Sequence, residues 1–207
     1  MKGDTILNLS SRPATRKMMS MVGLPTPQPL LRAEGPWRER PLEGSSIGLG
    51  PEDGPLLAIL EALGADVSVC SPEDLAGIHG LVLDCTQLET VTDLRRLYDF
   101  FHPRLRSLLP CGRAVLVGRP ASSGGTPSGS AVRHALVGFT KSLAKELGRK
   151  GGTANLITVD PGAEPQLQGP LAFFLSRRSA FVSGQSLHVS GGEGGAAWSV
   201  PLEGRTA

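Results

Sequence analysis

The stretch RAVLVGRPASSGGTPSGSAVRHALVGFTKSLAKELGRKGGTANLITV, residues 113–159, decides the fold. We expect a strand over Arg113–Gly118, then a Ser/Gly loop, a long helix that ends at Gly148, and a second strand over Ala154–Val159. The helix carries one apolar stripe at three- and four-residue spacing, formed by Val132, Ala135, Leu136, Phe139, Leu143 and Leu147. A strand, a helix and a strand in this order are typical of a parallel sheet covered by helices.

The same alternation continues on both sides of this unit. Gly80–Cys85 (GLVLDC) is apolar with little alternation, as expected for a strand buried on both faces. Further strands are predicted over Ser46–Gly50, Ala65–Cys70 and Ser186–Ser190, and further helices over Pro55–Leu63, Thr92–Leu109 with a kink at Pro103, and Gly169–Arg177. The chain is therefore predicted to be α/β, with a doubly wound parallel sheet in a Rossmann/flavodoxin-like three-layer sandwich.

The segments that flank this domain differ from it in composition. Residues 1–44 are predicted to form an amphipathic N-terminal helix and a Pro/Gly-rich arm, residues 45–192 the domain, and residues 193–207 a tail or linker. The N-terminal segment has no long apolar run, so we expect neither a secretory signal nor a membrane anchor. Basic residues beside its methionines leave a targeting helix as the alternative.

Composition narrows the classes of function. With 207 residues, of which 40% are hydrophobic and 19% charged, the chain is expected to form one globular domain. The net charge of +2 is spread over interspersed acids and bases, so no nucleic-acid partner is expected. Cys70, Cys85 and Cys111 predict reduced, mostly buried thiols and hence a cytoplasmic protein, and the four histidines lack the spacing of metal ligands.

The turn after the first predicted strand is a weak candidate for cofactor binding. Gly50 and Gly54 are spaced as in dinucleotide-binding turns, but Leu56 stands where a third glycine would let the backbone approach a pyrophosphate. Acidic residues between the two glycines oppose a phosphate, and two prolines remove N–H donors. A plain tight turn is the simpler interpretation.

A second weak candidate is the Ser/Gly loop before the long helix. Ser122, Ser123 and Thr126 lie where backbone N–H groups at a helix N-terminus could hold an anion. This pattern leaves a binder of flavin or of a nucleotide phosphate as one hypothesis, and an ordinary surface loop as the other. Thr126 or Ser128 is also expected to cap the helix.

Two blocks of sequence resemble a known family. Ala135–Leu147 (ALVGFTKSLAKEL) resembles the active-site helix of the short-chain dehydrogenase/reductases (SDRs), especially the 3-oxoacyl-acyl-carrier-protein reductases. Phe181–Gly192 (FVSGQSLHVSGG) resembles the closing motif of that family, and Pro161-Gly162 its Pro-Gly turn. The resemblance covers about residues 45–192, so that this domain would be a degenerate SDR domain.

A narrower resemblance involves the flanking segments. The pattern at Gly23–Pro27, the segment Phe100–Arg106 and the terminal Pro201–Gly204, which repeats Pro41–Gly44, are similar to the N-terminal domain of high-molecular-weight 3-oxoacyl-acyl-carrier-protein reductases. That resemblance implies a flavodoxin-like, non-catalytic first domain, with a complete reductase domain expected downstream.

The chain departs from the family where the chemistry would be. The family uses a tyrosine as general acid, a lysine four residues later, and a serine that orients the carbonyl group. Aligned on Leu136–Phe139, Gly129 stands at the tyrosine position and Arg133 at the lysine position, and the strand that should deliver the serine ends in Gly118-Arg119. Tyr98, the only tyrosine, is in another helix. No catalytic residue is therefore assigned.

Besides the binder of flavin or of a nucleotide phosphate, two further classes of function remain open. The first is a non-catalytic domain of a bipartite 3-oxoacyl reductase, which serves dimerisation and supports the reductase domain; no cofactor is expected in it. By analogy with the family, Leu136, Phe139 and Leu143 would then lie in a homodimer interface. The second is an NAD(P)H-dependent 3-oxoacyl reductase with a rearranged site.

Overall fold

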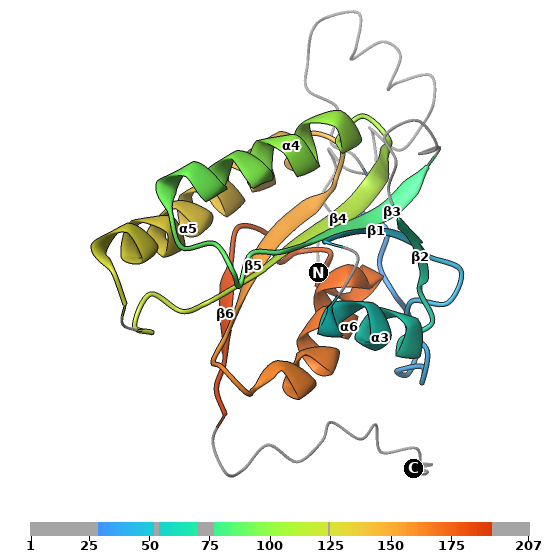
Figure 1. Ribbon diagram of the computed structural model, residues 1–207. Helices are drawn as coiled ribbons and strands as arrows, with labels where there is room; N and C mark the ends of the chain where they lie inside the picture. The colour runs from blue at the N-terminus through green and yellow to red at the C-terminus, as the bar shows by residue number, and fades with distance from the viewer. Residues whose placement is uncertain (1–28, 52–53, 70–76, 124, 192–207) are drawn as a thin grey trace, which may run out of the picture.

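A parallel sheet is the frame of the molecule (Figure 1). The computed structural model describes residues 29–51, 54–69, 77–123 and 125–191. The strands are β1 Ser46–Gly50, β2 Asp66–Val69, β3 Ile78–Asp84, β4 Leu108–Gly118, β5 Thr153–Val159 and β6 Ser186–Val189. They pair in the order β2-β1-β3-β4-β5-β6, and every pair is parallel. The order reverses between β1 and β3, as in flavodoxin-like sheets, so a crevice for a ligand is expected beside these two strands.

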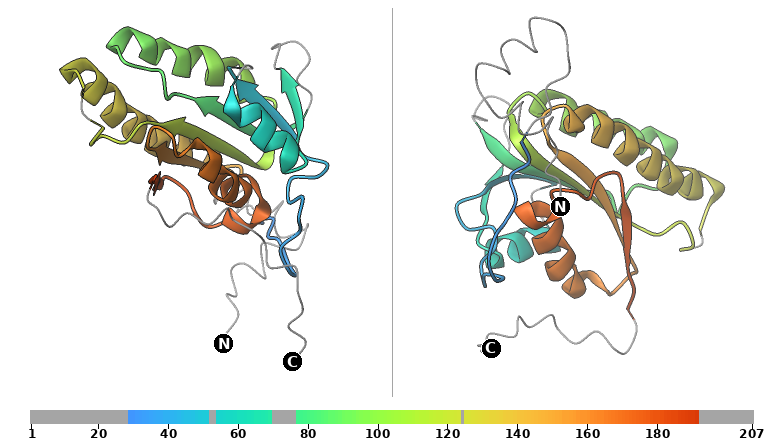
Figure 2. Two further views of the ribbon diagram at one scale, coloured as in Figure 1. Left: turned by 60° about the horizontal axis from the view of Figure 1, so that its bottom comes forward. Right: turned by 180° about the vertical axis from the view of Figure 1, so that it is seen from behind.

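Helices cover both faces of the sheet (Figure 2). The helices are α3 Pro55–Ala62, α4 Arg95–Arg104, α5 Pro127–Gly148 and α6 Gln168–Leu175, with short 3-10 turns η1 Val91–Leu94, η2 Glu164–Leu167 and η3 Arg177–Ser179. α4 and α5 pack on one face, and α3 and α6 on the other. The predicted three-layer α/β sandwich is thereby confirmed.

The two cores explain why the central strands are apolar throughout. Along β3, Leu81 and Leu83 belong to the core under α4 and α5, whereas Val82 between them belongs to the core under α3 and α6. Because successive side chains of a strand point to opposite faces, a strand covered on both sides has no polar face.

The largest difference from the sequence prediction concerns the helix expected to run to Leu109. It ends at Arg104, and the chain turns into β4, which begins at Leu108 rather than at Arg113. Pro103 has no N–H for the Asp99 carbonyl, and Nη1 of Arg104 donates to that carbonyl at 3.4 Å. Pro103 thus lies in the last turn and helps to end the helix instead of kinking it.

The arm before β1 is irregular over its described residues, as predicted, and is anchored to the domain. Leu42 is fully buried in the core under α3 and α6, and its N–H donates to the Leu63 carbonyl at 3.1 Å. The predicted N-terminal helix and C-terminal tail lie outside the described residues. Among the helices that are described, none combines the length and apolarity needed to cross a membrane.

Candidate functional site

The candidate site lies at the carboxyl ends of the strands, because open parallel α/β sheets bind ligands in the crevice beyond these ends. The five predicted residues lie there on two separate loops, one after β1 and one after β4. Cavities of about 680 and 600 Å³ lie elsewhere in the described part of the chain, and none of the five residues lines either of them.

Gly50, at the end of β1, accommodates an aromatic ring of the chain itself. A Cβ atom on Gly50 would lie 2.6 and 2.7 Å from two ring atoms of Phe100, a buried residue of α4. Packing alone therefore requires a residue without a side chain here.

Gly54 precedes α3 and offers few donors to a phosphate. Its backbone is extended, its side-chain position is open, and the next residue, Pro55, has no N–H. Leu56, at the place of the family's third glycine, is buried in the core. Over its described residues this turn offers few N–H donors to the pyrophosphate of a dinucleotide, and cofactor binding at Gly50 and Gly54 stays an untested prediction.

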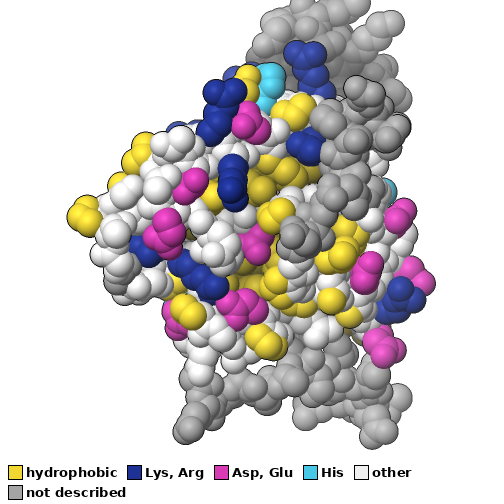
Figure 3. All heavy atoms as spheres, in the orientation of Figure 1, with side chains coloured by type: hydrophobic (Ala, Val, Ile, Leu, Met, Phe, Trp, Pro, Cys, Tyr) yellow, Lys and Arg dark blue, Asp and Glu magenta, His cyan; other side chains and the backbone are white. Residues whose placement is uncertain are grey.

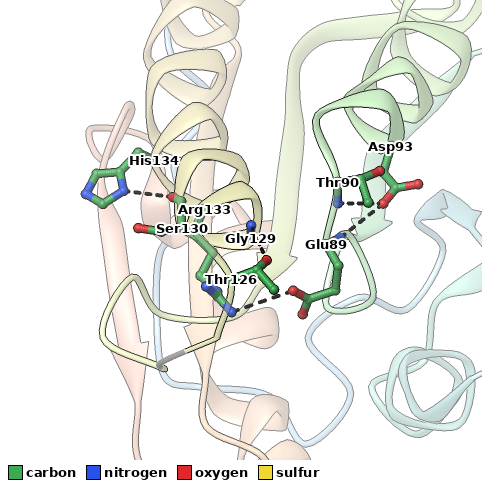
Figure 4. Close-up of polar contacts among 8 residues, drawn as sticks. All are labelled: Glu89, Thr90, Asp93, Thr126, Gly129, Ser130, Arg133 and His134. Carbon is green, nitrogen blue, oxygen red and sulfur yellow. Dashed lines mark hydrogen bonds and ion pairs between the residues drawn. The ribbon is translucent and has the colours of Figure 1, made fainter.

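The loop after β4 leads into α5 through a side-chain cap (Figure 4). Oγ1 of Thr126 accepts a hydrogen bond from the Gly129 N–H at 3.1 Å, which confirms the predicted capping role. Ser122 and Ser123 are exposed. The Gly129 N–H, one of the first of the helix, is thus already paired with the Thr126 hydroxyl oxygen. The loop therefore has fewer free N–H donors for an anion.

Beside this loop, the chain fills the space that a side chain at position 129 would need. A Cβ atom on Gly129 would lie 2.6 Å from Oε2 of Glu89 and 3.3 Å from Nη1 of Arg133. Arg133 is 7% exposed; its Nη2 lies 3.9 Å from Oε2 of Glu89, and its Nη1 has no hydrogen-bond partner among the described residues. Figure 4 shows Glu89 and Arg133 pointing toward each other across the start of α5.

The backbone of Glu89 is held in place by the turn that follows it. The Asp93 carboxylate accepts from the Thr90 N–H at 2.8 Å and from the Glu89 N–H at 3.1 Å. The bonds from Thr90, and then that from Glu89, lower the pKa of Asp93. The Thr90–Asp93 spacing is a capping box and could have been recognised in the sequence, but its consequence for Gly129 could not.

A second ion pair lies where the family's serine would be. Nη2 of Arg119 lies 2.8 Å from Oε1 of Glu164, and its Nη1 donates to the Val159 carbonyl at 3.1 Å. Burial raises the pKa of Glu164. Backbone hydrogen bonds, the hydrogen bond from Arg119 and the charge of Arg119 lower it by more than burial raises it, so the pKa is below its usual value. The pair joins the end of β4 to the segment after β5. Nothing in the sequence had marked Glu164.

The remaining candidate groups are dispersed. Tyr98 is 53% exposed on α4 and stacks on His102, with ring centroids 4.6 Å apart. Cys85 and Cys111 are free thiols, buried and half-buried, and burial raises the pKa of Cys85. In the described ranges, no three His, Cys, Asp or Glu side chains are placed to hold a metal. On the face in Figure 3, Lys and Arg are interspersed with Asp and Glu.

The predicted interface residues need a correction. Leu136 and Leu143 are 1% and 3% exposed, because they pack in the chain's own core under α4 and α5. A side chain buried within its own protomer has no surface left for a partner, so assigning these two leucines to an interface was wrong. Phe139 is half-buried, and its ring packs against Phe101 with centroids 5.4 Å apart.

The chain was compared with known proteins in sequence and in structure. No protein-family model matches the chain. The chain is 29% identical over 134 residues to 3-oxoacyl-(acyl-carrier-protein) reductase FabG of Haemophilus influenzae, a match that covers 49% of this chain and 54% of that protein. With FabG of Escherichia coli K12 it shares 26% identity over 110 residues, which are 39% and 45% of the two chains. The chain thus matches about half the length of these curated relatives.

Solved structures share the fold. A short-chain dehydrogenase/reductase from Serratia marcescens matches with a TM-score of 0.56 and 21% identity, over 73% of this chain and 98% of that one. The fold is that of the short-chain dehydrogenase/reductases. A blue fluorescent protein from a metagenomic library, solved in complex with NADPH, matches with a TM-score of 0.57 and 18% identity, over the same shares of the two chains. The chain is thus similar to these proteins in fold, and to the FabG relatives in sequence over about half of their length.

Proposed function

We propose that this chain is a non-catalytic SDR domain of a 3-oxoacyl reductase, which serves dimer assembly and supports a reductase domain. The observation that carries the proposal is the side-chain space at Gly129. Glu89 and Arg133 of the chain itself take up the place where the family's tyrosine would begin.

The chemistry of ketone reduction explains why this observation matters. A hydride that reaches a carbonyl carbon leaves a negative oxygen, and a general acid must give that oxygen a proton. Gly129 has no side chain, and Arg133 puts a guanidinium where the family has the ammonium of a lysine. Arg119, at the serine position, is engaged with Glu164 and with the Val159 carbonyl. Each of the three positions therefore lacks the group that the reaction needs.

A partner surface is the positive part of the proposal. Directly opposite its buried face, α5 carries Ala131, Ala135, Gly138 and Ser142, spaced so that they lie on one side of the helix. Gly138 is exposed and has open space around it, although glycine inside a helix costs about 1 kcal/mol relative to alanine. Close approach of a second backbone would explain its presence, and a homodimer formed through α5 would supply one.

The link to a larger reductase rests on the narrower sequence resemblance. The segment Phe100–Arg106 resembles that of the first domain of high-molecular-weight 3-oxoacyl reductases. In the structure its two phenylalanines are buried in the core under α4 and α5, and Pro103 lies in the last turn of α4. The strand order, flavodoxin-like over the first five strands, is consistent with this assignment.

The test is a titration of the full chain with NADPH and with NADH, followed by calorimetry, and an assay of NADPH consumption with a short 3-oxoacyl thioester. We expect neither saturable binding nor turnover. Saturable binding of NADPH or NADH, or turnover of the thioester, would overturn the proposal, provided that the binding or turnover changes in the Arg133→Met variant. That control separates the chain's own activity from that of a co-purified reductase.

The second candidate function is an NAD(P)H-dependent oxidoreductase with a rearranged site. The curated relatives favour it, because those reported above are named 3-oxoacyl reductases, and one structural neighbour was solved with NADPH. Turnover by this chain alone, lost when Arg119 is replaced by methionine, would favour this candidate over the first. Bound cofactor without turnover would count against both.

A further inference from the structure

A cavity of about 680 Å³ lies at the opposite edge of the sheet from the candidate site. It is bordered by the amino ends of β1, β3 and β4, by the arm before β1 and by the segment after α6. Ligand pockets in proteins commonly have volumes of about 300–1,000 Å³. The cavity is therefore large enough for a small organic molecule.

Arg113, in β4, lines this cavity with an unsatisfied guanidinium. It is 2% exposed, and its Nε donates to the Ser176 carbonyl at 3.2 Å. Nη1 and Nη2 are both buried without a hydrogen-bond partner in the described part of the chain. A guanidinium stays charged in proteins, and a buried charge without a partner is strongly unfavourable. The structure thus leaves up to four N–H donors in need of an acceptor.

The charges around Arg113 do not supply that acceptor. Glu34 and Glu43 line the cavity, but no carboxylate of the described residues forms an ion pair with Arg113. Burial lowers the pKa of Arg113, and the charge of Arg177 acts in the same direction. The basic lining residues outnumber these two glutamates; they are Arg32, Arg38, Arg113, Arg177, Arg178 and His79.

Two of the lining arginines, Arg178 and Arg32, already contact other groups of the chain. Nη2 of Arg178 donates to the Gly35 carbonyl at 2.6 Å, and its guanidinium stacks 4.6 Å from the Trp37 ring. Arg32 lies 4.3 Å from the Phe181 ring. Arg177 is exposed, begins η3, and forms no ion pair with a described carboxylate. Arg38 is also exposed and forms no ion pair with a described carboxylate, but among the lining arginines it is the charge of Arg177 that acts on Arg113. Arg113 and Arg177 are therefore the two cations placed to act together on one ligand.

We propose that this cavity binds the anionic group of a small molecule, a phosphate or a carboxylate, through Arg113 and Arg177. An arginine fork holds either group with two parallel hydrogen bonds. The rest of the ligand would lie against the apolar lining residues Leu31, Trp37 and Leu175. This site is separate from the edge compared above with the reductases, and the proposal does not depend on the proposed function.

The experiment follows thermal unfolding of the full chain in sodium phosphate, sodium acetate and sodium chloride at matched ionic strength, with calorimetry for affinity. A ligand that binds only the folded chain raises the Tm as its concentration rises. We expect phosphate or acetate to raise the Tm saturably and chloride not to. A saturable rise with phosphate identifies the bound group as a phosphate, and a saturable rise with acetate identifies it as a carboxylate.

Two variants and a control decide the assignment. Arg113→Met should abolish the shift and, without ligand, be at least as stable as the wild type, because a buried unpaired charge is removed. Arg177→Gln, which alters an exposed residue, should weaken binding about tenfold, as expected when one charge-assisted contact is lost. Arg133→Met removes the other buried, incompletely paired arginine, and should leave the shift unchanged.

The opposite results would overturn the proposal. These are no saturable shift of the wild type with either anion, or an equal shift in Arg113→Met. If Arg113→Met does not fold, unchanged binding by Arg177→Gln has the same weight.

Discussion

The Oε2 atom of Glu89 lies 2.6 Å from the place that a Cβ atom on Gly129 would take. Forty residues separate the two in sequence, and η1 and the start of α5 bring them together. A tyrosine at position 129 could enter only if the carboxylate left. The position that the family uses for its general acid is thus filled by an acid of the chain itself, next to a buried arginine.

Gly129→Ala should cost less than about 1 kcal/mol of unfolding free energy, because the side chain of Glu89 is 55% exposed and can move, and the ion pair it leaves is weak. Gly118→Ala is the matched comparison. Its Cβ atom would lie 2.8 Å from the buried Leu136, which cannot move freely, so about 1–3 kcal/mol should be lost. Urea denaturation measures both. Equal losses would mean that Glu89 is fixed in place.

Gly50→Ala should destabilise the chain by about 1–3 kcal/mol, because the new methyl group would overlap the buried ring of Phe100. Gly54→Ala should change stability little, since its backbone is extended and nothing lies within 4 Å. Adding Phe100→Leu to Gly50→Ala should recover part of the loss. A Gly50→Ala chain as stable as the wild type would contradict the packing role of this glycine.

Arg119→Met should lower the unfolding free energy by about 1–2 kcal/mol at neutral pH, because a half-buried Glu164 loses its charged partner. The pKa of Glu164 is lower in the folded state, so this stabilisation is complete above the unfolded pKa of about 4.3 and is lost as the pH falls through the folded pKa. Denaturation at pH 7 and near pH 3 should therefore show a smaller difference between variant and wild type at acid pH.

The exposed pair Arg95–Asp99 is the control for this experiment. Its nitrogen and oxygen are 2.9 Å apart on the surface of α4. Arg95→Met should leave the unfolding free energy nearly unchanged at either pH, because water and salt screen an exposed ion pair. A loss as large as that of Arg119→Met would show that burial does not distinguish the two pairs.

Gly138→Arg should dissociate the proposed dimer, because a long charged side chain would project from the face of α5 that carries the small residues. Light scattering after size exclusion measures the mass. Glu61→Arg, an exposed change on α3 across the sheet, should leave the mass unchanged. If the wild type is a monomer, the proposed dimer is contradicted. In that case Gly138→Ala should raise the unfolding free energy of the monomer by about 1 kcal/mol.

The order of strands and helices could be predicted because it depends on local pattern. The predicted strand Ser46–Gly50 agrees with β1, and the helix expected over Pro55–Leu63 differs from α3 by one residue. The prediction failed where two patterns overlap. Leu105 and Leu108 continue the helical spacing of α4, yet Leu108 pairs with Ile78 as the first residue of β4. Only the neighbouring strand decides between the two.

The sequence by itself determined the alternation that builds the sheet, and also the absence of a tyrosine and a lysine at positions 129 and 133. Both depend on which residue stands where, and no contact can change them. Only the tertiary structure decided what took their place, and which buried guanidinium nitrogens have no acceptor among the described residues. Glu89 reaches Gly129, and Arg113 lines a cavity without an ion pair to any described carboxylate, because side chains far apart in the sequence meet only when the sheet and its helices pack.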